Sequence, residues 1–429
     1  MKFFIITLGC KVNQYESQAI FEKLIDFGFR KSDSIENADI IIINSCTVTA
    51  ESDKKVRKSI HKARSKNKNA IIVLTGCMAQ AFKEKSLNED VDIILGNSQK
   101  TEILEKINEF ILNRKRTVSV NDYNCNCNHD DFKVRKFYDR TRAFIKIEDG
   151  CNRFCSYCII PYARGRVRSK PLEKVYSEIK NLADNGYKEI VLVGINLFSY
   201  GQDINSNLCE VIEKISTIDS LKRIRLGSLE PECMSEDVII RLSRQEKLCP
   251  QFHLSLQSGC DATLKRMNRH YSKSEYKDIV NNLRKYFKNS SITTDLMVGF
   301  AGETDKEFNE SLEFVKDIGF SKIHVFPYSV REGTKAALFD NQVSSEVKSK
   351  RTQIMLKVAQ ESREKFLKSQ IGLTEDVLFE KEVFKNNYEG YTKNYTPIIL
   401  KSEENLSGKI IDIKIESLSD AHCIGKLVK

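Results

Sequence analysis

The sequence lacks the features of a secreted or membrane-bound protein. No uncharged stretch reaches membrane-spanning length. The opening segment MKFFIITLGCKVNQ has only a short apolar run, without the long hydrophobic region and small-residue cleavage site of a signal peptide. Proline is scarce, with 6 residues in 429, and no low-complexity tract occurs. We therefore expect a globular, cytoplasmic protein of two or three domains with no membrane partner.

The sequence also lacks the residue sets of common hydrolytic enzymes. It shows no Ser/His/Asp arrangement and no paired carboxylates of the kind used in acid–base or nucleophilic catalysis. Cysteine, by contrast, is abundant, with 13 residues. In the reducing cytosol cysteines seldom form disulfides and more often bind metal or take part in catalysis. The positions of these cysteines therefore carry the functional information.

Three cysteines, Cys151, Cys155 and Cys158, lie close together in one short segment. An iron–sulfur cubane needs thiolates on its irons, and four cysteines would fill them all. Three leave one iron open to a substrate or cofactor, which suggests a reactive cluster more than a plain electron carrier. Structural zinc is the alternative, but it normally takes four ligands, often from two CxxC-type pairs. No second pair lies nearby, so the spacing favours a cluster.

Three further cysteines, Cys10, Cys46 and Cys77, each follow an apolar run that is expected to form a strand. The runs cover 3–8, 39–43 and 70–74, and helical patterns cover 17–27 and 52–66. This alternation indicates an open parallel α/β sheet with helices on both faces, and ligands of such sheets gather beyond the carboxyl ends of the strands. We expect the three thiols to converge there and to hold a second cluster with an open iron.

The alternative for Cys10, Cys46 and Cys77 is that they are small buried hydrophobes. Three cysteines in the same topological position, two of them directly after glycine, make this alternative less favoured. The other cysteines show no ligand spacing. Two lie in a polar segment and are interpreted as incidental, and five are interpreted as structural: Cys125 and Cys127 in the first group, and Cys209, Cys233, Cys249, Cys260 and Cys423 in the second.

From about residue 137 the alternation of strands and helices continues. Six candidate strands cover 143–148, 189–195, 223–229, 252–258, 292–299 and 322–328, and helical patterns such as 172–185, 273–288 and 305–318 separate them. A full eight-unit barrel typically needs about 250 residues. Six units in this length predict a partial (β/α)6 TIM-like barrel. Chemistry in such barrels occurs on the loops after the strands, and the Cys151–Cys158 segment follows the first strand.

Polar and glycine residues near the ends of three of these strands are candidates for cofactor binding. Polar groups that alternate with apolar ones in a barrel strand would point into its open end. The alternative is ordinary hydrogen bonding at strand ends. The candidates are Gly194, Asn196, Ser255, Gln257 and Asp295.

The chain is expected to divide into four segments. These are an N-terminal open-sheet domain at 1–115, a linker at 116–136, the partial barrel at 137–368 and a small C-terminal antiparallel β-barrel at 369–429. The last assignment depends on three strand-like runs, at 377–384, 397–401 and 409–416.

The two sets of three cysteines and their flanking residues resemble the radical S-adenosylmethionine methylthiotransferase family. The stretches that carry the resemblance are 7–17 (TLGCKVNQYES), 44–49 (NSCTVT), 151–166, in which Tyr157 precedes the third cysteine, and 256–261 (LQSGCD). They are most similar to the branch that methylthiolates N6-threonylcarbamoyladenosine beside the tRNA anticodon. The resemblance covers essentially the whole chain.

This resemblance implies two [4Fe-4S] clusters and S-adenosylmethionine as cofactors. Cys151, Cys155 and Cys158 would hold the cluster that cleaves S-adenosylmethionine to a 5′-deoxyadenosyl radical, with Tyr157 among the cofactor-binding residues. The radical would activate carbon 2 of the adenine, and the N-terminal cluster would supply the sulfur, because an aromatic C–H bond is too inert for acid–base catalysis. The implied partners are tRNA and a low-potential electron donor such as a flavodoxin or ferredoxin, and the C-terminal barrel would be the TRAM-like domain of the family.

Other functions stay open at this point. The same chemistry could act on isopentenyladenosine in tRNA or on an aspartate of a ribosomal protein. A protein of another class, a non-catalytic RNA-binding iron–sulfur sensor, would need the clusters but not the barrel. A six-unit barrel with polar strand ends therefore argues against the sensor.

Two groups of basic residues are candidate RNA contacts. Lys54, Lys58 and Lys62 recur every four residues and line one face of the helix expected at 52–66. A charge run of this kind is usually a solvated face, and RNA contact is the alternative. Arg164, Arg166 and Arg168 form the second group, just beyond Cys158. The overall net charge of +10 is compatible with a polyanionic partner but does not require one.

The expected C-terminal barrel is a poor electrostatic anchor for RNA. Residues 371–429 contain 8 Lys, no Arg and 10 Asp or Glu, a net charge of −2. Since phosphate binding depends on the number of cations, this domain would have to recognise shape or stack on bases. Tyr388, Tyr391 and Tyr395 are candidates for stacking, and packing inside the barrel is the alternative.

Overall fold

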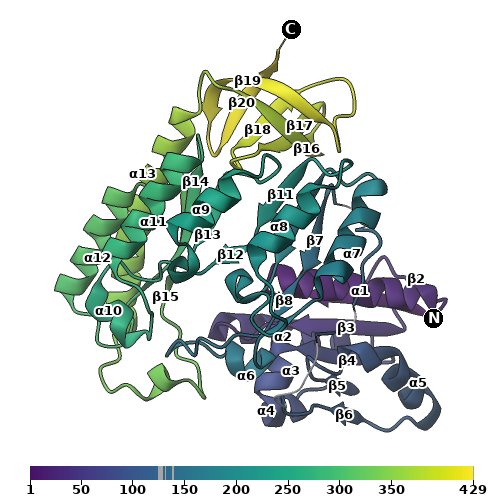
Figure 1. Ribbon diagram of the computed structural model, residues 1–429. Helices are drawn as coiled ribbons and strands as arrows, with labels where there is room; N and C mark the ends of the chain where they lie inside the picture. Colours follow the sequence, from purple (N-terminus) through teal and green to yellow (C-terminus); the bar gives the residue numbers. More distant parts are fainter. Residues whose placement is uncertain (124–128, 131, 138–139, 429) are drawn as a thin grey trace.

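The computed structural model describes residues 1–123, 129–130, 132–137 and 140–428. Three regions follow one another along the chain: an N-terminal sheet domain, an open barrel in the middle, and a small closed barrel at the C-terminus (Figure 1). The N-terminal domain and the closed barrel lie at opposite ends of the open barrel (Figure 1). The fold is the mixed α/β arrangement that the sequence predicts.

The N-terminal domain is a six-stranded parallel sheet with the order β2-β1-β3-β4-β5-β6. Its strands are β1 (Lys2–Thr7), β2 (Arg30–Lys31), β3 (Ile40–Ser45), β4 (Ile71–Gly76), β5 (Ile93–Leu95) and β6 (Thr117–Ser119). Alternate residues of the central strands enter two different hydrophobic cores. Ile40 and Ile42 pack with helix α1 (Lys11–Asp26), whereas Ile41 and Ile43 pack with helix α2 (Ala50–Lys66). Both faces of the sheet are covered, as the continuous apolar runs predict.

Two boundaries in this domain differ from the prediction. Helix α1 begins at Lys11, directly after Cys10, whereas the predicted helix began at residue 17. Polar residues in its first turns hydrogen-bond to the strand ends and hide the apolar periodicity there. Strand β6 lies inside segment 116–136, which was predicted to be a linker. It pairs with β5 as a three-residue edge strand, too short to show a period in the sequence. Residues 132–137 pack onto the core through Phe132 and Phe137, and Cys125 and Cys127 lie outside the described residues.

The open barrel consists of six consecutive parallel β segments, as predicted. They are β7 (Arg142–Lys146), β10 (Glu189–Val193), β11 (Arg223–Leu226) with β12 (Ser228–Leu229), β13 (Gln251–Leu254), β14 (Ser291–Val298) and β15 (Lys322–Pro327). The predicted strand at 223–229 is divided at Gly227, where the hydrogen bonding separates into a three-stranded and a four-stranded sheet. A side chain at position 227 would approach the Leu192 carbonyl oxygen to 3.1 Å, so glycine permits this sharp bend.

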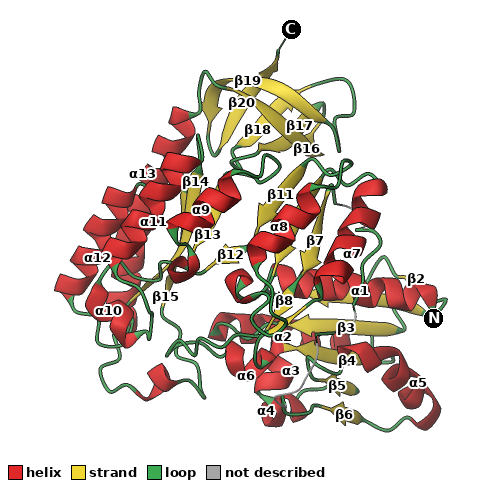
Figure 2. Cartoon of the chain, viewed as in Figure 1, coloured by secondary structure: helices red, strands yellow, loops and turns green. Residues whose placement is uncertain are grey.

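Helices cover the outside of the open barrel (Figure 2). They are α7 (Leu172–Asp184), α8 (Leu208–Ser216), α9 (Glu236–Ser243), α11 (Lys273–Tyr286), α12 (Asp305–Ile318) and the 25-residue α13 (Ser345–Ser369). Capping boxes formed by Ser272 with Glu275 and by Thr304 with Glu307 fix the starts of α11 and α12. None of the helices in the described part of the chain combines the length and the apolar character needed to cross a bilayer.

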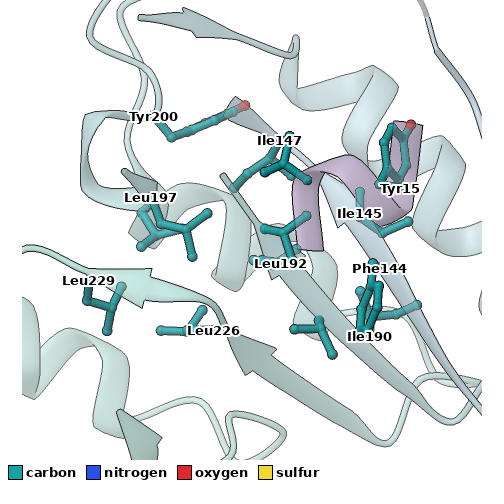
Figure 3. Packing of buried hydrophobic residues seen from close by; sticks show 14 of the residues in the cluster. Tyr15, Phe144, Ile145, Ile147, Ile190, Leu192, Leu197, Tyr200, Leu226 and Leu229 are labelled. Carbon is teal, nitrogen blue, oxygen red and sulfur yellow. The ribbon is translucent and has the colours of Figure 1, made fainter. Parts of the chain in front are cut away.

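The N-terminal domain is joined to the open barrel by a continuous hydrophobic core. Tyr15 of α1 lies beside Ile145 of β7 in this core, and Ile190 and Leu192 of β10 follow next to them (Figure 3). The Tyr15 hydroxyl donates to Glu178 of α7 at 2.8 Å. The two domains are therefore packed as one unit.

The C-terminal region is a closed five-stranded barrel. Its strands are β16 (Thr374–Phe384), β17 (Asn387–Thr392), β18 (Pro397–Lys401), β19 (Ile410–Ser419) and β20 (His422–Leu427), in the order β16-β17-β18-β20-β19. It docks on the ends of the open-barrel strands that are remote from the cysteine loop. Arg223 and Arg225 donate to the backbone carbonyls of Asp376 and Lys393 at 2.6 and 2.9 Å.

The three tyrosines considered for base stacking belong to this barrel and its docking surface. Tyr388 is in the barrel core. Tyr391 and Tyr395 stack on each other at 4.6 Å, and the Arg142 guanidinium lies over both rings. The packing alternative is therefore correct for Tyr388, whereas Tyr391 and Tyr395 are partly exposed and pack against each other and Arg142 at the docking surface.

Candidate functional site

The loop that carries Cys151, Cys155 and Cys158 is held mainly by backbone hydrogen bonds. It follows β8 (Glu148–Asp149) at the carboxyl end of β7. The Cys151 amide donates to the Gly165 carbonyl at 3.0 Å, and the Cys158 amide donates to the Cys155 carbonyl at 2.9 Å. Phe154 adopts a left-handed backbone conformation with φ of 49°. The loop thus reverses within a few residues and keeps its three thiols partly exposed on one side of the barrel opening.

Arg269 is the strongest polar neighbour of this loop, and the sequence interpretation missed it. Its guanidinium donates to the Cys155 sulfur at 3.3 Å and pairs with Glu230 at 2.5 Å. Burial raises the pKa of Cys151 to about 12, and the neighbouring Cys155 adds to this effect. Binding iron would convert such thiols to thiolates, and Arg269 provides a positive charge beside them. The only sequence signal for Arg269 was its place in a basic segment after Cys260.

Buried polar atoms without partners surround the opening near this loop. Among the described residues, nothing pairs with Glu148 Oε1, with either polar atom of the Asn196 side chain, or with Gln257 Oε1. Burial raises the pKa of Glu148 well above the range of an ordinary carboxyl group, and Cys151 is among the groups that its charge affects. Orphaned polar atoms of this kind imply a polar ligand. The set fits the amino and carboxylate groups of S-adenosylmethionine.

The other predicted cofactor residues have neighbours of several kinds. Gly194 lies against Glu148, since a Cβ there would come within 2.6 Å of Oε2. The Ser255 hydroxyl is 3.0 Å from that of Ser228. Asp295 faces His253 at 3.4 Å. Tyr157 packs edge-on against an aromatic ring in a small apolar cluster.

The strand ends of the N-terminal sheet bring Cys10, Cys46 and Cys77 together. Cys10 follows β1, Cys46 follows β3 and Cys77 begins the short helix α3 (Cys77–Ala81) after β4. The sheet order β1-β3-β4 makes these strands neighbours. Burial raises the pKa of Cys46 to about 11, and Cys77 and Cys10 both add to this effect.

Two glycines allow the strand ends to approach this closely. Gly9 and Gly76 both have φ of +102°, a conformation that residues with side chains rarely adopt. A Cβ at Gly9 would lie 2.7 Å from Cys46 Cβ and 2.9 Å from its sulfur. A Cβ at Gly76 would lie 2.4 Å from the Ser45 carbonyl oxygen. The glycines before Cys10 and Cys77 are thus required by the close contact between strands.

Asn13 connects the strand ends and was not singled out as a site residue from the sequence. Its amide group donates to the carbonyls of Leu8 and Ser45 at 2.7 and 3.0 Å. Its side-chain oxygen accepts a hydrogen bond from Arg164 at 2.5 Å. Asn13 therefore fixes the ends of β1 and β3 relative to each other and joins them to the loop of the open barrel.

Arg164 is fully buried at the junction between the two domains, which corrects its prediction as an RNA contact. Its guanidinium donates to Glu16 of α1 at 2.8 Å and to Asp149 of the barrel at 2.9 Å, in addition to Asn13. Burial alone would lower the pKa of Arg164, but Asp149, Cys77, Glu16 and Cys10 together hold it well above its usual value. Its charge therefore acts on the N-terminal thiols and cannot reach a phosphate.

A dense group of buried charges surrounds Arg164. The carboxylates of Glu16, Asp130 and Asp149 lie within 4.8 Å of one another, but cations are already bound to them. Lys146 pairs with Glu16 and Asp149 at 3.2 and 3.3 Å and with Asp130, and Lys100 pairs with Glu16. These carboxylates serve as counter-ions and do not form a metal site.

The other two arginines of the second basic group differ from each other. Arg168 is 9% exposed and donates to the carbonyls of Arg164 and Arg166 at 2.8 and 2.9 Å, so its prediction as an RNA contact is also wrong. The sequence could not distinguish these residues. Arg164 ends the short helix α6 (Ile160–Arg164), Arg168 begins β9 (Arg168–Ser169), and Arg166 lies in the irregular turn between them, where no periodic pattern indicates which side chain is buried. Arg166 is exposed and lies over the Phe154 ring of the cysteine loop, with 4.6 Å to its centroid.

A second set of contacts ties the domains together on the other side of the site. Arg331, in the loop after β15, donates to the Thr47 hydroxyl at 2.7 Å and to Asp53 at 2.8 Å. Asn97 donates to the Ala163 carbonyl at 2.6 Å and lies 3.8 Å from the Cys77 sulfur. The segment after Cys46 and the segment after Cys158 are thus both held at the interface between the N-terminal sheet and the open barrel.

Helix α2 presents its predicted basic face to solvent. Lys54, Lys58 and Lys62 are exposed, while Val56, Ile60 and Ala63 are buried against the sheet. The helix begins just after the segment that carries Cys46, and Thr49 caps it by accepting from the Ser52 amide at 3.1 Å. The basic face therefore adjoins the N-terminal cysteine site.

Comparison with family models and solved structures identifies the class of enzyme to which this chain is similar. Residues 2–96 match the uncharacterized protein family UPF0004, and residues 145–315 match the radical SAM superfamily. A solved radical S-adenosylmethionine methyltransferase, TsrM from Kitasatospora setae, superposes with a TM-score of 0.54 at 14% identity, covering 76% of this chain and 72% of that one. This likeness shows the fold of a radical S-adenosylmethionine enzyme.

Named relatives identify a family within this class of enzymes. The threonylcarbamoyladenosine tRNA methylthiotransferases MtaB of Bacillus subtilis and Thermotoga maritima are 36% and 40% identical, over 99% and 97% of this chain and 95% and 94% of theirs. A tRNA-2-methylthio-N(6)-dimethylallyladenosine synthase of Clostridium botulinum strain Okra is 37% identical, over 96% of this chain and 94% of its own. The chain belongs to the tRNA methylthiotransferase family of radical S-adenosylmethionine enzymes.

Proposed function

We propose that this protein adds a methylthio group to carbon 2 of N6-threonylcarbamoyladenosine beside the anticodon of tRNA. The observation that carries the proposal is the buried Arg164 network, which bonds the segment after Cys158 to Asn13 and Glu16 of the helix that follows Cys10. Relatives named for this reaction match over nearly the whole chain. A radical initiator and a sulfur donor must act on the same carbon, and the Arg164 contacts between the two domains support a reaction at this interface.

The proposed ligands are the six cysteines, each set holding one [4Fe-4S] cluster with an open iron. With S-adenosylmethionine bound, the cluster at Cys151, Cys155 and Cys158 supplies the one-electron chemistry that an inert C–H bond needs. Arg269 balances the charge of the thiolates, and Glu148, Asn196 and Gln257 orient the cofactor's polar groups. Gly194, Ser255, Asp295 and Tyr157 complete the cofactor surroundings.

The partners are proposed to be tRNA and a low-potential electron donor such as a flavodoxin or ferredoxin. Lys54, Lys58 and Lys62 on α2 are exposed cations on the domain of the proposed sulfur-donor site, and Arg166 is an exposed cation beside the cysteine loop of the open barrel. Cations in this position would attract the phosphates that flank the substrate base. The C-terminal barrel, docked at the far end of the open barrel, would contribute to RNA binding through shape.

The experiment is a reaction of the cluster-loaded protein with S-adenosylmethionine, a reductant and anticodon stem-loop RNA. Three RNAs differ only beside the anticodon, where they carry threonylcarbamoyladenosine, dimethylallyladenosine or adenosine. Nucleoside mass spectrometry should detect the 2-methylthio product of the first RNA and none of the third. Product from the dimethylallyl RNA alone would assign the protein to the other branch, and no cleavage of S-adenosylmethionine at all would favour the non-catalytic sensor.

Analysis of iron and sulfide tests the two-cluster proposal separately. Two cubane clusters require about eight of each per chain. A content of about four would leave one cluster and would overturn the proposed sulfur-donor site.

A further inference from the structure

The segment 328–344 connects β15 to α13 and contacts parts of the chain beside both cysteine sites. It contains one short 3-10 helix, η4 (Lys335–Leu338). Its first residues bond to the turn that follows Cys46 in the N-terminal domain, and later residues bond to the cysteine loop of the open barrel. We call 328–344 the connecting segment, because it joins two sites that belong to different domains.

The first contact holds the turn between β3 and α2. The Arg331 guanidinium donates to the Thr47 hydroxyl at 2.7 Å and to Asp53 at 2.8 Å. The Thr47 hydroxyl donates in turn to Asp53 at 2.6 Å, so the three side chains form a closed set. The Ala50 amide adds a hydrogen bond to the Ser329 hydroxyl at 3.0 Å. Because the donors of a guanidinium lie in a rigid plane, these contacts fix the orientation of the turn as well as its distance.

The second contact joins the connecting segment to the cysteine loop of the open barrel. The Ala336 amide donates to the Ser156 carbonyl at 2.7 Å, and Ser156 lies between the second and third cysteines of that loop. The Ser156 hydroxyl donates to the Arg266 carbonyl at 2.8 Å. A Cβ at Gly333 would lie 3.7 Å from Ile159 Cδ1, so the segment also packs against the residue after the third cysteine. The connecting segment therefore follows any movement of this loop.

Arg331 is buried between the two contacts, with 4% of its surface exposed. The Thr334 amide and hydroxyl both donate to the Arg331 carbonyl, at 3.1 and 2.6 Å, and close a tight turn between the two contacts. The guanidinium lies over the Phe82 ring, with 5.1 Å to its centroid, and Phe82 is the C-cap of the helix that begins at Cys77. Arg331 thus touches the segments that follow two of the three N-terminal cysteines.

We propose that Arg331 is a positioning residue for methylthio transfer, which holds the segment after Cys46 in place relative to the cysteine loop of the open barrel. The inference rests on the proposed function, since only a reaction that uses both sites depends on their relative position. A displacement of about 1 Å between reacting groups can lower a rate by about 100-fold. Loss of the Arg331 contacts should therefore leave cleavage of S-adenosylmethionine intact and impair the step that needs both sites.

The test compares the wild-type protein with Arg331→Met, both loaded with clusters, on stem-loop RNA that carries threonylcarbamoyladenosine. Mass spectrometry measures 5′-deoxyadenosine and the 2-methylthio nucleoside in the same reaction. We expect Arg331→Met to form 5′-deoxyadenosine at the wild-type rate, whereas its product per 5′-deoxyadenosine falls by about tenfold or more. Arg331→Lys keeps the charge beside Asp53 but loses the fork, so it should recover part of this ratio.

Hydrogen exchange gives a second readout that does not depend on turnover. Arg331→Met should accelerate amide exchange over residues 47–53, because the turn loses the contacts that oppose its local opening. Exchange in the core strand β14 should be unchanged. Wild-type exchange over residues 47–53 in this variant would overturn the assignment.

Arg351 provides a matched control within one domain. It is 5% exposed, donates to Glu303 at 2.7 Å and to Asp305 at 2.8 Å, and lies over the Phe308 ring with 5.4 Å to its centroid. These partners all belong to the open barrel, so Arg351→Met removes a similar buried pair without touching the N-terminal domain. It should destabilise the protein as Arg331→Met does and keep the wild-type ratio of product to 5′-deoxyadenosine.

The outcomes separate this inference from the proposed function. If the wild-type protein forms the methylthio product and Arg331→Met keeps the wild-type ratio, the Arg331 assignment is wrong and the function stands. An equal fall of the ratio in Arg351→Met would attribute the effect to lost stability and would also overturn the assignment. If the wild-type protein forms no product, the proposed function fails and the inference fails with it. Should Arg331→Met not fold, Asp53→Asn removes the charge of its partner, and an unchanged ratio in that variant overturns the assignment.

Discussion

The two cysteine sites hold their thiols in different ways. Cys151, Cys155 and Cys158 lie on one short loop, and backbone hydrogen bonds within that loop and to Gly165 determine its shape. Cys10, Cys46 and Cys77 come from three strands, and their approach depends on sheet order, on two glycines with positive φ and on Asn13. The first site is local in the sequence, whereas the second exists only when the N-terminal sheet has folded.

The sites also differ in how charge is arranged around them. Arg269 contacts the Cys155 sulfur directly, so the local site has its own cation. The distributed site depends on Arg164, which is six residues beyond Cys158 in the chain but acts on Cys10 and Cys77. One buried guanidinium therefore links the loop of the first site to the electrostatics of the second. The comparison shows that the second site depends on the interface between the N-terminal domain and the open barrel, whereas the first site depends on that interface less.

The largest expected effect comes from the local site. Cys155→Ala removes a central ligand of the radical cluster, so cleavage of S-adenosylmethionine should fall to background. Quantification of 5′-deoxyadenosine by mass spectrometry measures this. Cys233→Ala, which removes a neighbouring thiol outside the ligand set, is the matched control and should retain cleavage. Wild-type amounts of 5′-deoxyadenosine from the Cys155 variant would refute the assignment.

The distributed site should separate the two half-reactions. Cys46→Ala should still cleave S-adenosylmethionine but transfer no methylthio group, because the sulfur-donor cluster loses a ligand while the loop site is intact. Iron content should fall by about half, consistent with loss of one of two cubanes. Cleavage and product analysis of the same sample checks both points, and full product formation would make the N-terminal cysteines structural.

Arg164 tests the link between the two sites. Arg164→Met leaves Glu16 and Asp149 without their main partner, and breaking a buried pair in this way typically costs about 3–5 kcal/mol. Arg164→Lys keeps the charge but loses the forked contacts, so a smaller loss in the free energy of unfolding is expected, about 1–3 kcal/mol. Denaturant titration compares the two variants. Equal stability of both with the wild type would contradict the proposed junction.

Gly9 tests whether close contact between strands is specific to the distributed site. Gly9→Ala places a Cβ 2.7 Å from that of Cys46 and forces a strained backbone, at a cost of about 1–3 kcal/mol. Iron bound at the N-terminal site should decrease, while cleavage of S-adenosylmethionine continues. Gly28→Ala, at a position with φ of +94° and open space around it, controls for backbone strain alone. Similar iron loss in both variants would remove the argument from the Cys46 contact.

The smallest effect is expected on the outer surface of the N-terminal domain. Replacement of Lys54, Lys58 and Lys62 by Glu should weaken tRNA binding and flatten its dependence on salt, because fewer counter-ions are released. A slope reduced by about 2 units or more in log Kd against log salt is expected, and filter binding at several salt concentrations measures it. The same replacement at exposed Lys174, Lys180 and Lys288, on the barrel surface, should have less effect. Equal slopes in both triple variants would make the α2 face an ordinary solvated surface.

The sequence predicted the features that depend on local pattern. Continuous apolar runs identified the strands, and the four-residue spacing of Lys54, Lys58 and Lys62 identified the exposed face of α2. The place of Cys10, Cys46 and Cys77 after parallel strands predicted their convergence, since parallel strands end at the same edge. Strand β6 was missed because three residues show no period.

The prediction of Arg164 and Arg168 as RNA contacts was wrong for a physical reason. Basic composition indicates exposure only when the charges have no internal partner, and here Asp149 and Glu16 are brought to Arg164 by the docking of two domains. Their separation in the sequence gives no signal of this pairing. Asn13 and Arg269 were missed as site residues for the same reason.

By itself the sequence determined the class of chemistry and predicted the cysteine ligands, because cysteine spacing and strand-end position are local properties of the chain. The tertiary structure decided which charges are buried, which glycines are sterically required, and that the loop of one cysteine set supplies the counter-ion of the other. The glycine contacts join strands that are about 30 to 40 positions apart in the sequence. The contacts of Arg164 with Glu16 and Asn13 join residues more than one hundred positions apart, and only the folded packing of the sheet domain on the barrel brings such residues together.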